Sequence, residues 1–192
     1  MFLKKILNLI ILYLILIFLF TTLTRATPNE SFTSLLKENG KIIFIRHAYA
    51  PGNGDPDNFN LLDCATQRNL NSKGIADSKN IKIFFNKNKI EIDKILTSEW
   101  CRCKDTAKYA FENFEVKSFL NSFYSKKFYH NKSRQIKDLK KYIKNWKGEK
   151  NLVFVTHYVV ILEVLNLSAM PAEIIISDKN FNVLARQRFT NN

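Results

Sequence analysis

Short segments rich in Ile, Leu and Val alternate along the chain with longer amphipathic segments. The short apolar runs are typical of strands buried inside a parallel sheet, and the longer ones repeat their apolar residues with helical spacing. The predicted strands cover 41–45, 93–97 and 152–155, followed by a terminal hairpin of 173–177 and 181–188. The predicted helices run from Asn71 or Ser72 to about residue 85, and over 102–111, 133–146 and 158–167. Strand–helix alternation predicts an α/β fold, a three-layer α/β/α sandwich around a mostly parallel sheet.

The first 26 residues have the order of a secretory signal. Two lysines precede a long apolar stretch at 6–23, and small residues around Ala26 follow it. We expect 1–26 to be a signal peptide or an N-terminal membrane anchor, with a buried core helix or a cytosolic start as the alternative, and 27–192 to form one domain. The protein is then exported, periplasmic or anchored to the inner membrane facing outward. An anchored form would associate with the membrane through residues 6–23.

Positive charge is the unusual feature of the composition. The chain of 192 residues carries 30 Lys and Arg against 17 Asp and Glu, a net charge of +13. Residues 126–150 hold ten of these basic side chains and two acidic ones, and their spacing favours the solvated face of an amphipathic helix. A surface that steers anionic substrates or contacts acidic lipids is the alternative. No nucleic-acid-binding motif accompanies the charge, so no nucleic-acid partner is expected; the oligomeric state stays open.

Basic and imidazole side chains follow three of the predicted strands. These strand ends carry Arg46 and His47, then Arg102, then His157, whereas the third histidine, His130, lies among Lys and Tyr in a predicted solvated loop. Ligands of open α/β sheets bind beyond the carboxyl ends of the strands. Arginine suits phosphate oxygens and neutral histidine is a nucleophile, so this edge favours phosphoryl transfer without a metal.

Four motifs occur in a fixed order along the chain: FIRHA at 44–48, CATQRNLNSKG at 64–74, SEWCRCKDTA at 98–107 and VTH at 155–157. Together they resemble the motifs of the histidine phosphatase superfamily, which includes the phosphoglycerate mutases and the histidine acid phosphatases. The segment PGNGDP at 51–56 resembles the corresponding segment of a small, exported bacterial subgroup. The resemblance covers most of residues 41–176 and implies the phosphoglycerate mutase-like fold.

The resemblance also implies a role for each matching residue. His47 would be the nucleophile that forms a phosphohistidine, its tautomer fixed by a backbone carbonyl. Arg46, Arg102 and His157 would bind the phosphoryl oxygens. The family needs no metal and no organic cofactor, and the expected partner is a small phosphorylated substrate. A phosphatase acting on a phosphomonoester is the function implied. The alternatives are a catalytically silent domain that binds phosphorylated ligands or an anionic membrane, and a phosphomutase.

The proton donor of the family is missing from its usual places. Mutase-like members carry a Glu where this chain has Ser122, and acid phosphatases carry an Asp where it has Tyr158. Glu99 and Asp55 are the carboxylates nearest in sequence to the motifs, and Glu99 is the predicted general acid. An alternative is that Glu99 is simply a solvated residue in the first turn of a helix.

Three cysteines lie in or beside the motifs. Cys101 and Cys103 are too closely spaced for an ordinary zinc site. A disulfide from Cys64 to Cys101 would tie the long loop to the helix that carries the second arginine. A bond from Cys64 to Cys103, or three buried thiols, are the alternatives, and spacing does not separate them.

Overall fold

The structure is a computed structural model that describes Ile6 and residues 28–189. The predicted signal segment therefore lies outside the described residues, apart from Ile6, and its boundary stays a prediction. From Phe32 onward the described residues form one compact unit. No helix among the described residues is long and apolar enough to cross a membrane.

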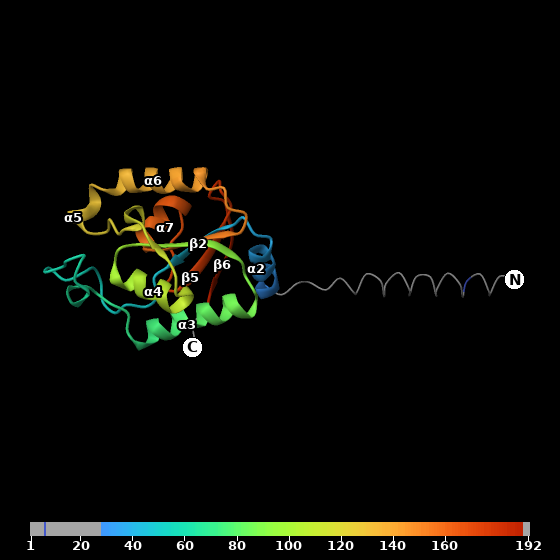
Figure 1. Cartoon of the computed structure of the whole chain (residues 1–192), viewed down its shortest axis with the longest axis horizontal. Helices are drawn as coiled ribbons and strands as arrows, with labels where there is room; N and C mark the ends of the chain where they lie inside the picture. The colour runs from blue at the N-terminus through green and yellow to red at the C-terminus, as the bar shows by residue number, and fades with distance from the viewer. Residues whose placement is uncertain (1–5, 7–27, 190–192) are drawn as a thin grey trace. The chain divides into compact units, whose positions relative to one another are not determined.

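A six-stranded sheet, in the order β3-β2-β4-β1-β5-β6, forms the centre of the fold. Figure 1 shows strands of this sheet between layers of helices. The strands are β1 (Ile42–Arg46), β2 (Ile92–Thr97), β3 (Glu115–Val116), β4 (Asn151–Thr156), β5 (Glu173–Ser177) and β6 (Val183–Arg188). The first four strands in this spatial order run parallel. β5 runs antiparallel to β1 and β6 antiparallel to β5, which confirms the predicted mostly parallel sheet and the terminal hairpin.

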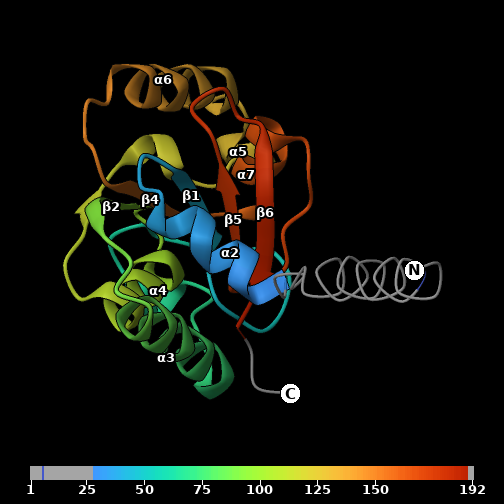
Figure 2. The ribbon, with the colours of Figure 1, turned by 90° about the vertical axis from the view of Figure 1, so that its right-hand side faces the viewer.

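Helices cover both faces of the sheet. They are α2 (Pro28–Lys37), α3 (Ser72–Lys87), α4 (Cys101–Phe111), α5 (Lys126–Tyr129), α6 (Lys132–Asn145) and α7 (Tyr158–Leu165). Side chains alternate across β1: Ile43 and Ile45 pack with α2, α3 and α4, while Ile42 and Phe44 pack with α6 and α7. Figure 2 shows α3 and α4 on one side of the sheet and α6 and α7 on the other. The three-layer prediction is confirmed.

The structure differs from the sequence prediction in the end of one helix and in three elements that were not predicted. The helix expected to reach residue 167 ends at Leu165, because Asn166 adopts the left-handed conformation and its N–H donates to the Leu162 carbonyl. α2, α5 and β3 were not predicted at all. β3 has only two residues, both exposed, so its sequence carries no alternating pattern.

The start of α3 packs directly on the chain that follows β1. The Asn71 side chain caps this helix by accepting from the Gly74 N–H, which confirms the predicted cap. A Cβ at Gly74 would lie 2.1 Å from the Tyr49 carbonyl oxygen, far inside contact distance. Glycine is therefore the only residue that lets α3 come this close to the segment after His47.

Candidate active site

The predicted site residues meet at one edge of the sheet, where the parallel strands end. Arg46 at the end of β1 lies opposite Thr156 of β4, and Thr97 of β2 lies opposite Val155. This register brings His47, His157 and the start of α4 around a cavity of about 310 Å³. Its lining includes all four residues predicted to act on the phosphoryl group, namely Arg46, His47, Arg102 and His157.

His47 is held in one orientation and one protonation state. The ring is 3% exposed, and its Nδ1–H donates to the Ala48 carbonyl at 2.8 Å. The other nitrogen, Nε2, lies 3.2 Å from Nε of Arg102 and accepts a hydrogen bond from it. Burial and the neighbouring Arg102 charge hold the pKa of His47 well below its usual value. The ring is thus neutral, and its Nε2 lone pair accepts from Arg102 at the wall of the cavity.

His157 is fixed by a chain of polar side chains from the start of α4. Its Nε2 lies 2.9 Å from the Ser98 hydroxyl, which in turn donates to the Asn121 side-chain oxygen at 3.0 Å. Because Ser98 uses its proton on Asn121, His157 Nε2–H is the donor to Ser98. Burial, followed by the charge of Arg102, lowers the pKa of His157 well below its usual value. The two imidazole rings meet edge to face, 5.4 Å apart.

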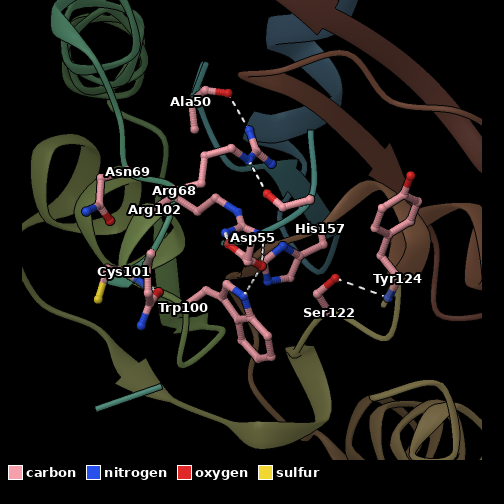
Figure 3. A network of polar contacts seen from close by, with 12 residues as sticks. Ala50, Asp55, Arg68, Asn69, Trp100, Cys101, Arg102, Ser122, Tyr124 and His157 are labelled. Carbon is pink, nitrogen blue, oxygen red and sulfur yellow. Dashed lines mark hydrogen bonds and ion pairs between the residues drawn. The ribbon is translucent and has the colours of Figure 1, made fainter. Parts of the chain in front are cut away.

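The guanidinium of Arg102 connects His47 to a carboxylate. Arg102 is 3% exposed and donates from Nη1 to Oδ1 of Asp55 at 2.5 Å and from Nη2 to Oδ2 at 3.3 Å. The indole N–H of Trp100 donates to the same Oδ2 at 2.9 Å, as Figure 3 shows. These hydrogen bonds from Arg102 and Trp100 to Asp55 hold the 51–56 loop against the first turn of α4.

Two further arginines line the cavity. Arg46 donates from Nη1 to the Ala169 carbonyl at 2.8 Å, and its guanidinium lies over the Tyr158 ring. The buried Nε of Arg46 has no hydrogen-bond partner among the described residues. Arg68 donates to the carbonyls of Gly54 and Ala50, so it holds the loop and faces the cavity at once (Figure 3).

Arg68 is the functional residue that the sequence analysis missed. It belongs to the matched segment at 64–74, but it does not follow a predicted strand, which was the pattern that identified the other basic residues. With both histidines neutral, the charged side chains of the cavity are three arginines and one aspartate, namely Arg46, Arg68, Arg102 and Asp55. The cavity therefore has a net charge of two positive charges. That charge matches a phosphomonoester, whose phosphoryl group carries nearly two negative charges at pH 7.

The two candidate carboxylates lie in different places. Glu99 does not line this cavity: its carboxylate accepts from the Asn121 amide at 2.5 Å and lines a neighbouring pocket. The placement of Glu99 therefore speaks against its predicted role as proton donor. Asp55 does line the cavity, together with Ser122 and Tyr158, which stand at the usual acid positions. Exposed His130 lies outside it, as expected.

Two of the three cysteines form a disulfide. Cys64 and Cys101 are bonded, with their Cα atoms 5.8 Å apart, which settles the pairing that spacing left open. Cys103 is a buried free thiol whose pKa burial raises to about 12. Among the described residues, no group of three or more His, Cys, Asp or Glu side chains is arranged to hold a metal ion.

Solved structures share this fold, whereas no protein-family model and no curated protein sequence matches the chain. The protein histidine phosphatase SixA, solved with tungstate, has a TM-score of 0.55 at 14% identity, over 77% of this chain and 96% of that one. Phosphoglycerate mutase from Thermus thermophilus gives 0.53 at 15%, over 76% and 97%. TTHB049 from the same organism gives 0.56 at 15%, over 79% and 97%. The chain therefore has the phosphoglycerate mutase-like fold, as its motifs predicted.

Proposed function

We propose that this protein is a phosphatase that hydrolyses a small phosphomonoester through a phosphohistidine on His47. One observation carries the proposal: a neutral, buried His47, whose Nε2 contacts Arg102, lines a cavity together with three arginines. A neutral imidazole is a nucleophile, and arginine forks bind phosphoryl oxygens. Structures of the same fold include a phosphoglycerate mutase and a protein histidine phosphatase, so the fold accommodates phosphoryl chemistry.

Each residue of the cavity has a role in this reaction. Nε2 of His47 attacks phosphorus while the Ala48 carbonyl accepts from Nδ1–H and stabilises the charge that develops on the ring. Arg46 and Arg102 hold the phosphoryl oxygens, and the neutral His157 joins them as an uncharged donor once its Nε2–H turns from Ser98 to the substrate. Water then hydrolyses the phosphohistidine and regenerates His47. Preorganised positive charge supplies most of the rate in such a transfer.

The test is phosphate release by the full chain from a panel of phosphomonoesters. We expect His47→Ala to abolish turnover and His130→Ala, at an exposed site outside the cavity, to leave it unchanged. Tungstate should inhibit the wild type, and EDTA should not. A folded His47→Ala protein with wild-type turnover would contradict the mechanism, and EDTA inhibition reversed by a divalent metal would indicate a metallophosphatase. Ligand binding without turnover would instead indicate a silent binding domain.

We further propose that the protein works outside the cytoplasm, as a member of an exported group. The apolar segment at 6–23 behind two lysines supports export, since it has the order of a secretory signal. The Cys64–Cys101 bond supports it independently, because disulfides persist mainly in oxidising compartments. Fractionation of cells that express the tagged chain tests this proposal: an active protein that stays in the cytoplasm would contradict it.

A further inference from the structure

The carboxylate of Asp55 occupies the place on Arg102 that a phosphoryl group needs. It accepts from both terminal nitrogens of the guanidinium, at 2.5 and 3.3 Å, which is the fork geometry that also suits phosphate oxygens. Its side chain is 16% exposed, and that of Arg102 is 4% exposed. A phosphoryl group that bound Arg102 in the same way would therefore have to displace Asp55.

The guanidinium of Arg102 separates His47 from Asp55. Its Nε faces Nε2 of His47 at 3.2 Å, while its Nη atoms face Asp55. A phosphoryl group that took the place of Asp55 would have His47 on one side, and a carboxylate displaced away from Arg102 would lie on the opposite side. In-line displacement needs this order, because the leaving oxygen departs opposite the attacking atom.

Asp55 lies in a segment whose backbone suits a change of position. Gly52 and Gly54 both have positive φ angles, 86° and 66°, and they flank Asn53 in an irregular loop. The loop is held to the cavity through side chains, by Arg68 at Gly54 and by Trp100 and Arg102 at Asp55. Asp55 is also the one carboxylate among the described residues that line the cavity.

We propose that Asp55 is the proton donor to the leaving group, and that it takes up its proton when the substrate displaces it from Arg102. This proposal rests on the proposed phosphatase function. In the free protein the carboxylate faces the charges of Arg102 and Arg68, with the protonated thiol of Cys103 nearby. When a dianionic phosphoryl group binds these arginines in place of Asp55, its negative charge lies beside the carboxylate. That charge favours protonation of Asp55.

The resulting steps balance. Nε2 of His47 bonds to phosphorus, the ester P–O bond breaks, and its electron pair moves to the leaving oxygen, which takes the proton of Asp55 and departs as an alcohol. Asp55, now a carboxylate, removes a proton from water as the water oxygen attacks phosphorus. The P–N bond breaks and its electron pair returns to Nε2, leaving phosphate, neutral His47 and a protonated Asp55.

The first arm of the test compares leaving groups. Asp55→Asn keeps the size of the side chain and an acceptor for Arg102 but supplies no proton. We expect it to lower kcat/KM, which reports only the steps up to cleavage of the ester, by about 100-fold or more for phenyl phosphate and by only a few-fold for nitrophenyl phosphate, because nitrophenolate departs without protonation. The controls are Asp57→Asn, at an exposed position of the same loop, and Glu99→Gln, beside the neighbouring pocket. Both should match the wild type on both substrates.

The second arm measures protons without turnover. Calorimetric titration with tungstate near about pH 6, in buffers of different ionisation enthalpy, gives the protons taken up on binding. We expect the Asp55→Asn variant to take up about one proton fewer than the wild type. Equal slowing of both phosphate esters, or equal proton uptake by the two proteins, would overturn the proposal. Absence of hydrolysis in the wild type would instead defeat the phosphatase function itself, and proton uptake would still report on Asp55.

Discussion

The two buried histidines of the cavity are held uncharged by their surroundings. Each is almost inaccessible to water, and Arg102 is the leading charge that disfavours a proton on either ring. The same conditions that make His47 a nucleophile therefore make the folded state resist protonation. In the unfolded chain both rings are free to bind protons at their ordinary pKa, near 6.5.

This difference predicts a loss of stability on the acid side. Because the folded-state pKa of both histidines is lowered, the unfolded chain binds more protons, so stability is fully present above about pH 6.5 and falls below it. The slope should approach about 2.7 kcal/mol per pH unit for two histidines, and about half of that in His47→Gln. Urea unfolding at about pH 7.5, 6.5 and 5.5, where most carboxylates stay charged, measures it. A wild type with a flat profile over this range would contradict the buried, neutral pair.

At the residue scale, the sequence located the histidines of the cavity better than its carboxylate. His47 and His157 follow apolar strands, and a strand end has a definite place in a parallel sheet. Glu99 is also near a strand end, but its side chain turns toward Asn121 instead of the cavity. Asp55 and Arg68 reach the cavity from a long loop, whose path depends on contacts that no local pattern encodes.

At the scale of elements, the disulfide fixes the long loop to α4. Cys64 lies four residues before Arg68 in the loop, and Cys101 precedes Arg102 in α4, so the bond connects the segments that supply two of the cavity's three arginines. The loop residues 48–71 contain no regular element other than one short 3₁₀ turn, Cys64–Thr66. The bond therefore limits how far this irregular segment can move from the helix.

Reduction should cost both stability and activity. Cys64 and Cys101 are 37 residues apart in sequence, so loss of the bond should lower the free energy of unfolding by about 4 kcal/mol on the chain-entropy model. Turnover should fall as well, since Asp55 and Arg68 lose their constraint. Activity and unfolding measured with and without dithiothreitol test this. The Cys64→Ser/Cys101→Ser variant should match the reduced protein and show no further response to the reagent; if it keeps wild-type turnover, the bond has no part in forming the cavity.

Regular elements were predictable where their burial pattern is strong. All three predicted parallel strands lie in the sheet, and α6 buries Ile136, Leu139 and Ile143 while its lysines face solvent. β3 and α5 were missed because two to four residues carry no period. The tight turn fixes only the antiparallel pairing of β5 with β6, and no local pattern encodes the antiparallel placement of β5 beside β1.

At the scale of the molecule, positive charge covers α6 and its flanks. Lys137, Lys140, Lys141 and Lys144 are exposed on this helix, as its spacing predicted for a solvated face. Ser125 and Phe128, just ahead of the helix, line the cavity. The net charge of +13 should therefore attract anionic substrates from a distance.

Salt dependence tests this attraction. We expect kcat/KM for a phosphomonoester to fall several-fold between about 20 and about 300 mM NaCl while kcat changes little, because salt screens long-range charge. Replacing the four exposed lysines of α6 by glutamine should reduce this fall without changing the free energy of unfolding by more than about 1 kcal/mol. A salt profile identical to that of the wild type would assign the attraction to the cavity arginines alone.

The close approach of α3 to the chain after His47 has a consequence for inherited variation. One methyl group at Gly74 has no room beside the Tyr49 carbonyl, so either the helix or the backbone two residues beyond the nucleophile must shift. A shift of about 1 Å at a reacting group can lower a rate by about 100-fold. A single-nucleotide change at this codon, remote from every group that touches phosphate, would thus have the phenotype of a lost catalytic residue.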